Sequence, residues 1–252
     1  MTAVLYAIPG SHPCAAVERA LQLKRLGYRR VDRIPIAARF LTRLRFDVST
    51  VPALEFGDGT RSSGSRAILR ALDERVPEPP LLPADENVRA LVERAEEWGD
   101  QVLQPLARRV IWAGLRRAPE AIAGYTAEAN LPLPRAVRTA SSPYVARLAQ
   151  RLVGADDLTI RADLISLPGH AGRIDRWIAD GTLGGAAANA ADLQIGASVR
   201  LLLTLADLRP LLDERPAGAL ARRWFPGYPG QVPAGTLPAA WLEDADERQR
   251  QQ

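Results

Sequence analysis

Apolar and polar positions in the first 75 residues follow two different periods. The run "AVLYAI" at 3–8 is short enough for a buried strand and ends at a Pro-Gly turn. "CAAVERALQLKRLG" instead has helical spacing, which puts Val17, Leu21 and Lys24 on one side. "ALEF" and "TRSS" flank Gly57-Asp58-Gly59, which is typical of a hairpin. The predicted order is β-α-β-α-β-β-α, with elements at 3–8, 14–27, 28–34, 37–46, 53–56, 60–63 and 65–75.

A proline-rich stretch, "VPEPPLLPADEN", follows this unit and favours a stiff linker. Beyond it the pattern is helical. We expect a long helix from Asn87, bent at Pro105, then a proline-interrupted segment at 118–143. Further helices are predicted at 144–153, 156–179 with a break at Pro168, and 190–206. The predicted divisions are 1–76, a linker at 77–87, a helical domain at 88–230 and an irregular tail at 231–252.

Composition narrows the chemistry that this chain can carry. With 252 residues, 47% of them hydrophobic, it can bury a real core. The single cysteine, Cys14, excludes an internal disulfide and the multi-cysteine zinc patterns. Only His12 and His170 could add ligands, so no metal site is expected. The start does not resemble a signal peptide, and no apolar run reaches the about 18 residues of a membrane span. We therefore expect a cytoplasmic protein that does not bind membranes.

The charge distribution argues against a nucleic-acid partner. The pI is 9.7, yet the net charge is only +4, from 33 basic and 29 acidic residues. Lys24 is the sole lysine, and arginine, which stays protonated, raises the pI. The arginines alternate with acids, as in "VRALVERAEEWGD". That pattern is typical of ion pairs on a solvated helix face rather than of a surface that follows phosphates.

Four motifs, in this order, resemble the cytosolic glutathione S-transferase family. "SHPCAAVERALQLKRLGY" resembles its first loop and helix, and "VPAL" its cis-proline strand. "GSRAILRALDE" resembles its acidic-Ser helix start, and "NAADLQIG" the Asp-containing helix start of its second domain. The resemblance spans most of residues 1–210. It implies an α/β N-terminal thioredoxin-like domain with a mixed four-stranded sheet and an all-α C-terminal domain. It also implies a cytoplasmic homodimer with a role in detoxification, using glutathione as co-substrate and no metal.

Val51-Pro52 is where the resemblance places a cis peptide bond. Cis bonds are accessible essentially only before proline. A cis bond here would turn the N–H and C=O of Val51 outward, so that a bound peptide pairs with them as an added strand. The alternative is an ordinary trans bond at the start of a strand.

Gly64 and Ser65 open the next predicted helix. Ser65 is a good N-cap, and the free N–H groups and helix dipole favour an anion there. The resemblance implies that this corner holds the γ-glutamyl carboxylate of glutathione. Gly64 departs from the family, which usually has Glu or Gln to bind the ammonium end, so a different small thiol remains an alternative. Arg43 and Arg45 are candidates for the glycyl carboxylate.

Ser11 stands where serine-type family members have their catalytic hydroxyl. A thiol with a pKa of about 8.5 is mostly protonated at pH 7, and lowering it by two units requires about 2.7 kcal/mol. A charge-assisted hydrogen bond of about 1.5–3 kcal/mol and a helix terminus of under about 1 kcal/mol suffice. His12 belongs to the predicted glutathione-binding set, but it is poorly placed to act as a base for Ser11.

Cys14 offers an alternative chemistry. Ser-His-Pro-Cys has the frame of Cys-Gly-Pro-Cys with the first sulfur replaced. A thiol in the first turn of a helix can be acidified, and a mixed disulfide with glutathione would make the protein a thiol transferase or reductase. Cys14 is equally interpreted as a small buried apolar side chain. A third reading is a non-catalytic binding or regulatory module on the same fold.

The acceptor for the thiol, a small-molecule electrophile, is expected beside the long helix that begins near Asn87. Its candidate pocket residues are Trp98, Gln101, Val102, Pro105 and Trp112, although core or interface packing explains the aromatic residues equally well. Farther on, Asn189 and Asp192 have the spacing of a capping box, which is a folding device. The predicted function is conjugation of a low-molecular-weight thiol to an electrophile.

Overall fold

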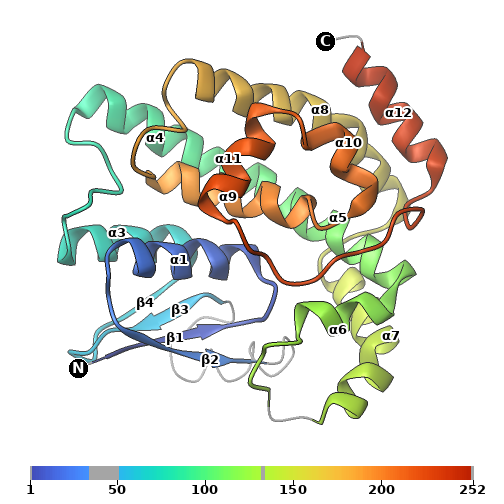
Figure 1. Cartoon of the computed structure of the whole chain (residues 1–252), viewed down its shortest axis with the longest axis horizontal. Helices are drawn as coiled ribbons and strands as arrows, with labels where there is room; N and C mark the ends of the chain where they lie inside the picture. Colours follow the sequence, from blue (N-terminus) through green and yellow to red (C-terminus); the bar gives the residue numbers. More distant parts are fainter. Residues whose placement is uncertain (1, 34–50, 132–133, 251–252) are drawn as a thin grey trace.

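The mixed four-stranded sheet predicted for the N-terminal part is confirmed in the computed structural model, which describes residues 2–33, 51–131 and 134–250, with side chains as far as 244. The strands are β1 (Ala3–Ala7), β2 (Tyr28–Asp32), β3 (Ala53–Glu55) and β4 (Arg61–Ser63), in the order β2-β1-β3-β4. β1 runs parallel to β2 and antiparallel to β3, and β3 is antiparallel to β4. Helices α1 (His12–Leu23) and α3 (Ser65–Arg75) cover one face (Figure 1). The helix predicted at 37–46, with Arg43 and Arg45, lies outside the described residues.

The carboxyl end of α1 is fastened to the segment that follows α3. Residues 76–85 contain no helix or strand. Lys24 is buried, and its Nζ donates to Asp73 at 2.8 Å and to the carbonyls of Val76 and of Pro79, the latter at 2.9 Å. A lysine ammonium has three hydrogens to donate, so its capacity is filled. The sole lysine of the chain therefore holds the connection in place.

The long helix predicted from Asn87 is interrupted ahead of Pro105. It consists of α4 (Glu86–Trp98), a π-helical turn (Gly99–Leu103) and α5 (Gln104–Arg117). Proline has no N–H to donate to the preceding turn, and a π turn absorbs the resulting mismatch. A Cβ at Gly99 would lie 2.8 Å from Ile195, so glycine permits the close approach of the neighbouring helix.

The remaining helices differ from the prediction at two prolines. α7 begins before Pro143 and contains it, and α8 continues through Pro168 without a break. In α8, Leu164, Leu167 and Ala171 are buried on both sides of that proline, and this packing outweighs the lost backbone hydrogen bond. None of the helices in the described ranges has the length and apolar character needed to cross a membrane. The elements are α6 (Ile122–Tyr125), α7 (Arg135–Leu152), α8 (Asp157–Ala179), α9 (Ala190–Leu202), α10 (Arg209–Leu212) and α11 (Pro216–Trp224), with 3-10 turns at Pro119–Ala121 and Ala206–Leu208.

The tail, predicted to be irregular, contains a further helix, α12 (Ala239–Arg250), which packs along α8. Arg161 of α8 forms an ion pair with Asp244 at 2.7 Å, and the guanidinium of Arg117 lies 4.8 Å from the Trp241 ring. The turn-rich composition before α12 concealed this helix, because its stability depends on contacts with α8.

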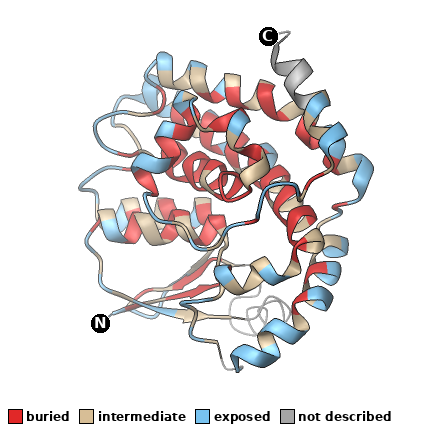
Figure 2. Ribbon diagram, turned by 45° about the vertical axis from the view of Figure 1, so that its right-hand side comes forward, coloured by how far each residue is buried: buried red, intermediate tan, exposed pale blue. Residues whose placement is uncertain are grey.

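Helix α9 forms the centre of the helical part and is buried along nearly its whole length (Figure 2). It contacts α1, α4, α5 and α11. The predicted capping box is confirmed: Asn189 Oδ1 accepts the Asp192 N–H at 2.9 Å, and Asp192 Oδ2 accepts the Asn189 N–H at 3.0 Å. The fold class predicted from the sequence, a thioredoxin-like α/β part followed by a predominantly helical part, is confirmed.

Candidate active site at the amino end of helix α1

Three chain segments meet at one edge of the sheet. In-register pairing of β1, β3 and β4 puts the end of β1, the start of β3 and the end of β4 side by side. The Val51–Pro52 peptide is cis, as predicted, and the Gly64 N–H donates to the Pro52 carbonyl at 2.9 Å. The structure therefore brings Val51, Pro52, Gly64 and Ser65 together, and Ser11 follows β1 at the same edge.

The start of α3 differs from the prediction by one residue. Gly64, not Ser65, is the N-cap, since its carbonyl accepts the Ile68 N–H at 3.1 Å. Gly64 has a φ of 82°, a conformation that favours glycine. Glycine adopts this backbone without strain, and a Cβ added at Gly64 would meet no atom within 4 Å. No capping side chain in the described residues accepts a hydrogen bond from the first-turn N–H groups of α3.

A buried carboxylate ties the start of α3 to α4. Glu96 Oε2 lies 2.7 Å from Arg70 and 3.4 Å from Arg66, and the side chain is fully buried. Burial raises the pKa of Glu96 although the two arginines oppose this effect. Because Glu96 is enclosed and paired, it does not supply the carboxylate that Gly64 lacks.

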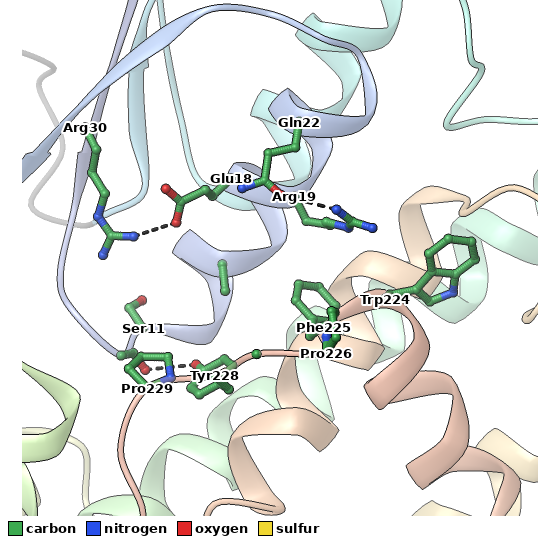
Figure 3. A pocket seen from close by; sticks show the side chains of 13 residues that line it. Ser11, Glu18, Arg19, Gln22, Arg30, Trp224, Phe225, Pro226, Tyr228 and Pro229 are labelled. Atoms are coloured by element: carbon green, nitrogen blue, oxygen red, sulfur yellow. Dashed lines mark hydrogen bonds and ion pairs between the residues drawn. The ribbon is translucent and has the colours of Figure 1, made fainter. Parts of the chain in front are cut away.

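Ser11 lines a cavity of about 280 Å³ between α1 and the segment that follows α11 (Figure 3). Its half-buried side chain points into this hollow from the amino end of the helix. Of the predicted glutathione-binding residues that the structure describes, Ser11 alone is in the wall. The wall consists of Gly10, Ser11, Ala15, Glu18, Arg19, Gln22, Arg30 and residues 224–229.

Charges in the cavity wall are largely paired. Glu18 accepts hydrogen bonds from Tyr28 at 2.9 Å and from Arg30 at 2.5 Å. Arg30 also donates to Asp32 at 2.8 Å. The wall is thus polar without a strong excess of either sign near Ser11. The described part of the chain contains no group of three His, Cys, Asp or Glu side chains that could hold a metal ion.

The C-terminal segment completes the site, and the hydrophobic pattern did not reveal this role. The Tyr228 hydroxyl donates to the Gly10 carbonyl at 3.0 Å, and Arg200 holds the Phe225 carbonyl at 2.9 Å. Gly10 has a φ of 71°, and a Cβ there would lie 2.9 Å from the Tyr125 ring. The loop that carries Ser11 is therefore held between two tyrosines. The only sequence signal was a tyrosine inside the turn-rich "PGYPG".

His12 does not belong to the glutathione groove in which the sequence placed it. The side chain is buried against α5, where it is hydrogen-bonded to the Gln104 backbone. Burial, and next the charge of Arg108, lower the pKa of His12 to about 3. Its Nε2 is buried and has no hydrogen-bond partner among the described residues. His12 is a neutral group of the domain core and not a base for Ser11.

Cys14 is buried, with 1% of its surface exposed. Burial raises the pKa of its thiol, while the Ser11 hydroxyl and the Ile8 backbone counteract this only in part. The prediction that the helix terminus acidifies this thiol is therefore wrong. Loss of water around the sulfur outweighs the helix dipole. This burial agrees with the interpretation of Cys14 as a small buried apolar side chain.

The five predicted acceptor residues do not line the cavity beside Ser11. Trp98 is buried against α8, where its ring lies 5.5 Å from that of His170 and 5.2 Å from that of Trp177. The extra residue in the π turn rotates everything after it by about 100° relative to a continuous helix. The prediction assumed one continuous helix, so the five residues expected on a single face are in fact divided between different faces. Gln101 and Val102 are exposed, whereas Pro105 and Trp112 are half-buried.

Comparisons with known proteins agree with this fold. Residues 5–80 match the family described as glutathione S-transferase, N-terminal domain, and no curated protein matches the chain. A glutathione S-transferase from Rhodospirillum rubrum F11 is 20% identical with a TM-score of 0.60, covering 96% of this chain and 99% of that one. The beta-etherase LigF from Sphingobium sp. strain SYK-6 is 18% identical with a TM-score of 0.58, covering all of both chains. Maleylacetoacetate isomerase from Anaeromyxobacter dehalogenans 2CP-1, with glutathione in its active site, is 22% identical with a TM-score of 0.51, covering 98% and 96%.

Identities at this level establish the fold alone. The described chain thus has the glutathione S-transferase fold, and its residues 5–80 match the N-terminal domain of that family.

Proposed function

We propose that this protein is a glutathione transferase-type enzyme, which activates a low-molecular-weight thiol for attack on an electrophilic small molecule. One observation carries the proposal: Ser11 follows β1 at the sheet edge where Val51 and Ser65 also lie, and its side chain lines a cavity of about 280 Å³ whose other walls come from α1, Arg30 and residues 224–229. The family match of residues 5–80 supports it. So does the similar isomerase that has glutathione in its active site.

The thiol peptide would lie along Val51, with its γ-glutamyl carboxylate at the uncapped N–H groups of α3 and its sulfur beside Ser11. Gly64 offers no side chain to the ammonium end, and Glu96 is enclosed by arginines. The site therefore favours the carboxylate and sulfur ends of the ligand over its amine. A small thiol without that amine fits the same positions.

Ser11 would act by donating its O–H hydrogen bond to the sulfur, which stabilises the thiolate. The thiol proton leaves to solvent. The sulfur lone pair then forms a bond to the electrophilic carbon, and the leaving group departs with the electron pair of the broken bond. The electrophile would bind in the cavity between α1 and residues 224–229, and not beside the five helix residues predicted from the sequence.

The test is turnover of glutathione with 1-chloro-2,4-dinitrobenzene by Ser11→Ala. We expect kcat/KM at pH 7 to fall about 25-fold, because the thiolate fraction falls from about 75% at a pKa of about 6.5 to about 3% at about 8.5. The pH profile should move up by about two units. Ser166→Ala on α8, which removes an equivalent half-buried hydroxyl, is the control. An unchanged profile in Ser11→Ala would refute the role of this hydroxyl.

The non-catalytic module remains a second candidate, and the absence of a carboxylate at Gly64 favours it. Retention on glutathione-agarose without turnover by the wild-type protein supports that alternative. Without retention, the same turnover assay is repeated with small thiols that lack the γ-glutamyl amine. Thiol exchange through Cys14 is disfavoured by the burial of its sulfur.

A further inference from the structure

A second cavity, of about 190 Å³, lies on the other side of the C-terminal segment. Its walls come from the end of α9, from α10, from α11 and from residues 228–231. Tyr228 contributes to both cavities. Ser11, Val51, Pro52, Gly64 and Ser65 do not line this second cavity, so Tyr228 is the one residue that it shares with the cavity beside Ser11.

Three arginines and one carboxylate line this cavity: Arg200, Arg209, Arg222 and Asp213. Asp213 forms an ion pair with Arg222, and its carbonyl accepts a hydrogen bond from Arg222 at 3.1 Å. Within the described ranges, neither Arg200 nor Arg209 has an ion-pair partner. The four side chains together carry a net charge of +2, which favours an anion in the cavity.

The two unpaired guanidinium groups are fixed by the backbone. Arg200 donates through Nε to the Phe225 carbonyl at 2.9 Å, and Arg209 donates through Nε to the Leu203 carbonyl at 3.3 Å. The terminal nitrogens of both make no hydrogen bond to the described part of the chain, and the Arg200 guanidinium lies 5.9 Å from the Tyr228 ring. A guanidinium anchored at Nε presents a planar pair of donors, which is the geometry that binds oxyanions.

The electrostatic environment of Arg200 points in the same direction. Burial lowers the pKa of this half-buried group, and the positive charges of Arg222 and Arg209 lower it further. The hydroxyl groups of Tyr228 and Tyr125 oppose these effects only in part. A bound anion would relieve this repulsion, and among the residues that the structure describes no carboxylate does so at Arg200.

We propose that this cavity binds a compact dianionic oxyanion, namely a phosphate group, either free or as a small monoester. A phosphate ester carries about −1.5 to −2 charges at pH 7, which matches the net charge of the cavity. The volume lies below the about 300 Å³ at which pockets for drug-sized ligands begin. A small ligand therefore fits, and a nucleotide does not.

The test is thermal unfolding of the full chain with inorganic phosphate at pH 7.5, against sodium chloride at the same ionic strength. Phosphate should raise Tm saturably, because a ligand that binds the folded state stabilises it by mass action. Arg209→Gln should weaken the apparent phosphate affinity at least tenfold. Arg147→Gln, which removes an equal charge from an exposed position on α7, should leave it unchanged.

Asp213→Asn keeps the proposal falsifiable if Arg209→Gln does not fold. It raises the net charge to +3 and should tighten phosphate binding several-fold, which loss of a merely structural ion pair would not do. Tighter binding of glycerol phosphate than of inorganic phosphate would identify a monoester as the ligand, and the reverse would identify free phosphate. The proposal is wrong if phosphate gives no more stabilisation than chloride. It is also wrong if Arg209→Gln behaves like Arg147→Gln, or if Asp213→Asn does not tighten binding.

Discussion

The two ends of helix α1 treat buried polar groups in opposite ways. At the carboxyl end, Lys24 is buried and its ammonium has three acceptors, among them Asp73 at 2.8 Å. At the amino end, the Nε2 of the equally buried His12 has no partner in the part of the chain that the structure describes, and burial raises the pKa of Cys14. Of the three side chains Ser11, His12 and Cys14, that of Ser11 lines a cavity and the other two do not.

This contrast separates a folding device from a candidate site. A buried charge whose every donor is satisfied specifies one arrangement of the surrounding chain. Polar groups left without partners lower stability and are tolerated where another requirement acts on the same residues. The amino end of α1 is the part of the helix where a requirement beyond folding explains the residues best.

The largest effect is expected from removing the buried ammonium group at the carboxyl end of α1. Lys24→Met should lower the free energy of unfolding by about 3–5 kcal/mol, because Asp73 and two carbonyls lose their buried partner. The midpoint of urea unfolding measures this change. Arg75→Met, which removes the exposed ion pair with Asp58, is the matched control.

The control should cost about 1 kcal/mol or less, as exposed ion pairs do. If Lys24→Met were as mild as Arg75→Met, the carboxyl end of α1 would not be a folding device and the comparison of the two ends would fail.

A second effect, of about 2 kcal/mol in the free energy of unfolding, is expected on lowering the pH, and it arises at the amino end of α1. The pKa of His12 is about 3 in the folded chain and about 6.5 when unfolded, so below pH 6.5 the unfolded chain binds the extra proton. The contribution of neutral, buried His12 to the free energy of unfolding is therefore fully present above pH 6.5, and it is lost as the pH falls toward 3. Between pH 7 and 5 this removes about 2 kcal/mol of unfolding free energy.

His12→Asn removes the titrating ring, so its unfolding free energy should fall less between pH 7 and 5 than that of the wild type. His170→Asn serves as the comparison, because the half-buried His170 has its pKa lowered chiefly by burial. If His12→Asn retained the full pH dependence of the wild type, burial of His12 would not be its cause.

Local signals predicted much of the fold. The hairpin at Gly57-Asp58-Gly59 and the capping box from Asn189 to Asp192 are short patterns whose geometry follows from the residues themselves. Helix α12 and the helix through Pro168 depend on contacts with distant segments, and the hydrophobic period does not encode them.

The residues of the candidate site also fall into those that the sequence indicates and those that only the folded chain reveals. Ser11 became a candidate because the strand, turn and helix start around it resemble the first loop of a known family, and these elements adjoin in sequence. The ring of His12 is buried close to Gln104 and Arg108 of α5, and the local motif has no signal for these distant neighbours. The hydrogen bond between Tyr228 and Gly10 joins residues 218 positions apart, so only the folded chain reveals it.

A third effect, of about 1.5 kcal/mol, is expected at Cys14. Cys14→Ala deletes a group about the size of a methyl from the core, which costs up to about 1.5 kcal/mol of unfolding free energy. Transferase turnover per folded molecule should stay within twofold of the wild type, because the sulfur is enclosed. Loss of turnover in Cys14→Ala with retention in Ser11→Ala would reverse the assignment and restore thiol exchange.

The smallest effect tests whether the C-terminal segment belongs to the site. Tyr228→Phe removes the hydroxyl that donates to the Gly10 carbonyl but keeps the ring in the walls of both cavities. The loss of one hydrogen bond should lower the unfolding free energy by about 1 kcal/mol. Transferase kcat/KM should fall severalfold, because the loop before Ser11 gains freedom, while phosphate stabilisation remains. Equal kcat/KM in the wild type and in Tyr228→Phe would mean that Tyr125 and helix α1 are sufficient to position Ser11. The C-terminal segment would then not be part of the site.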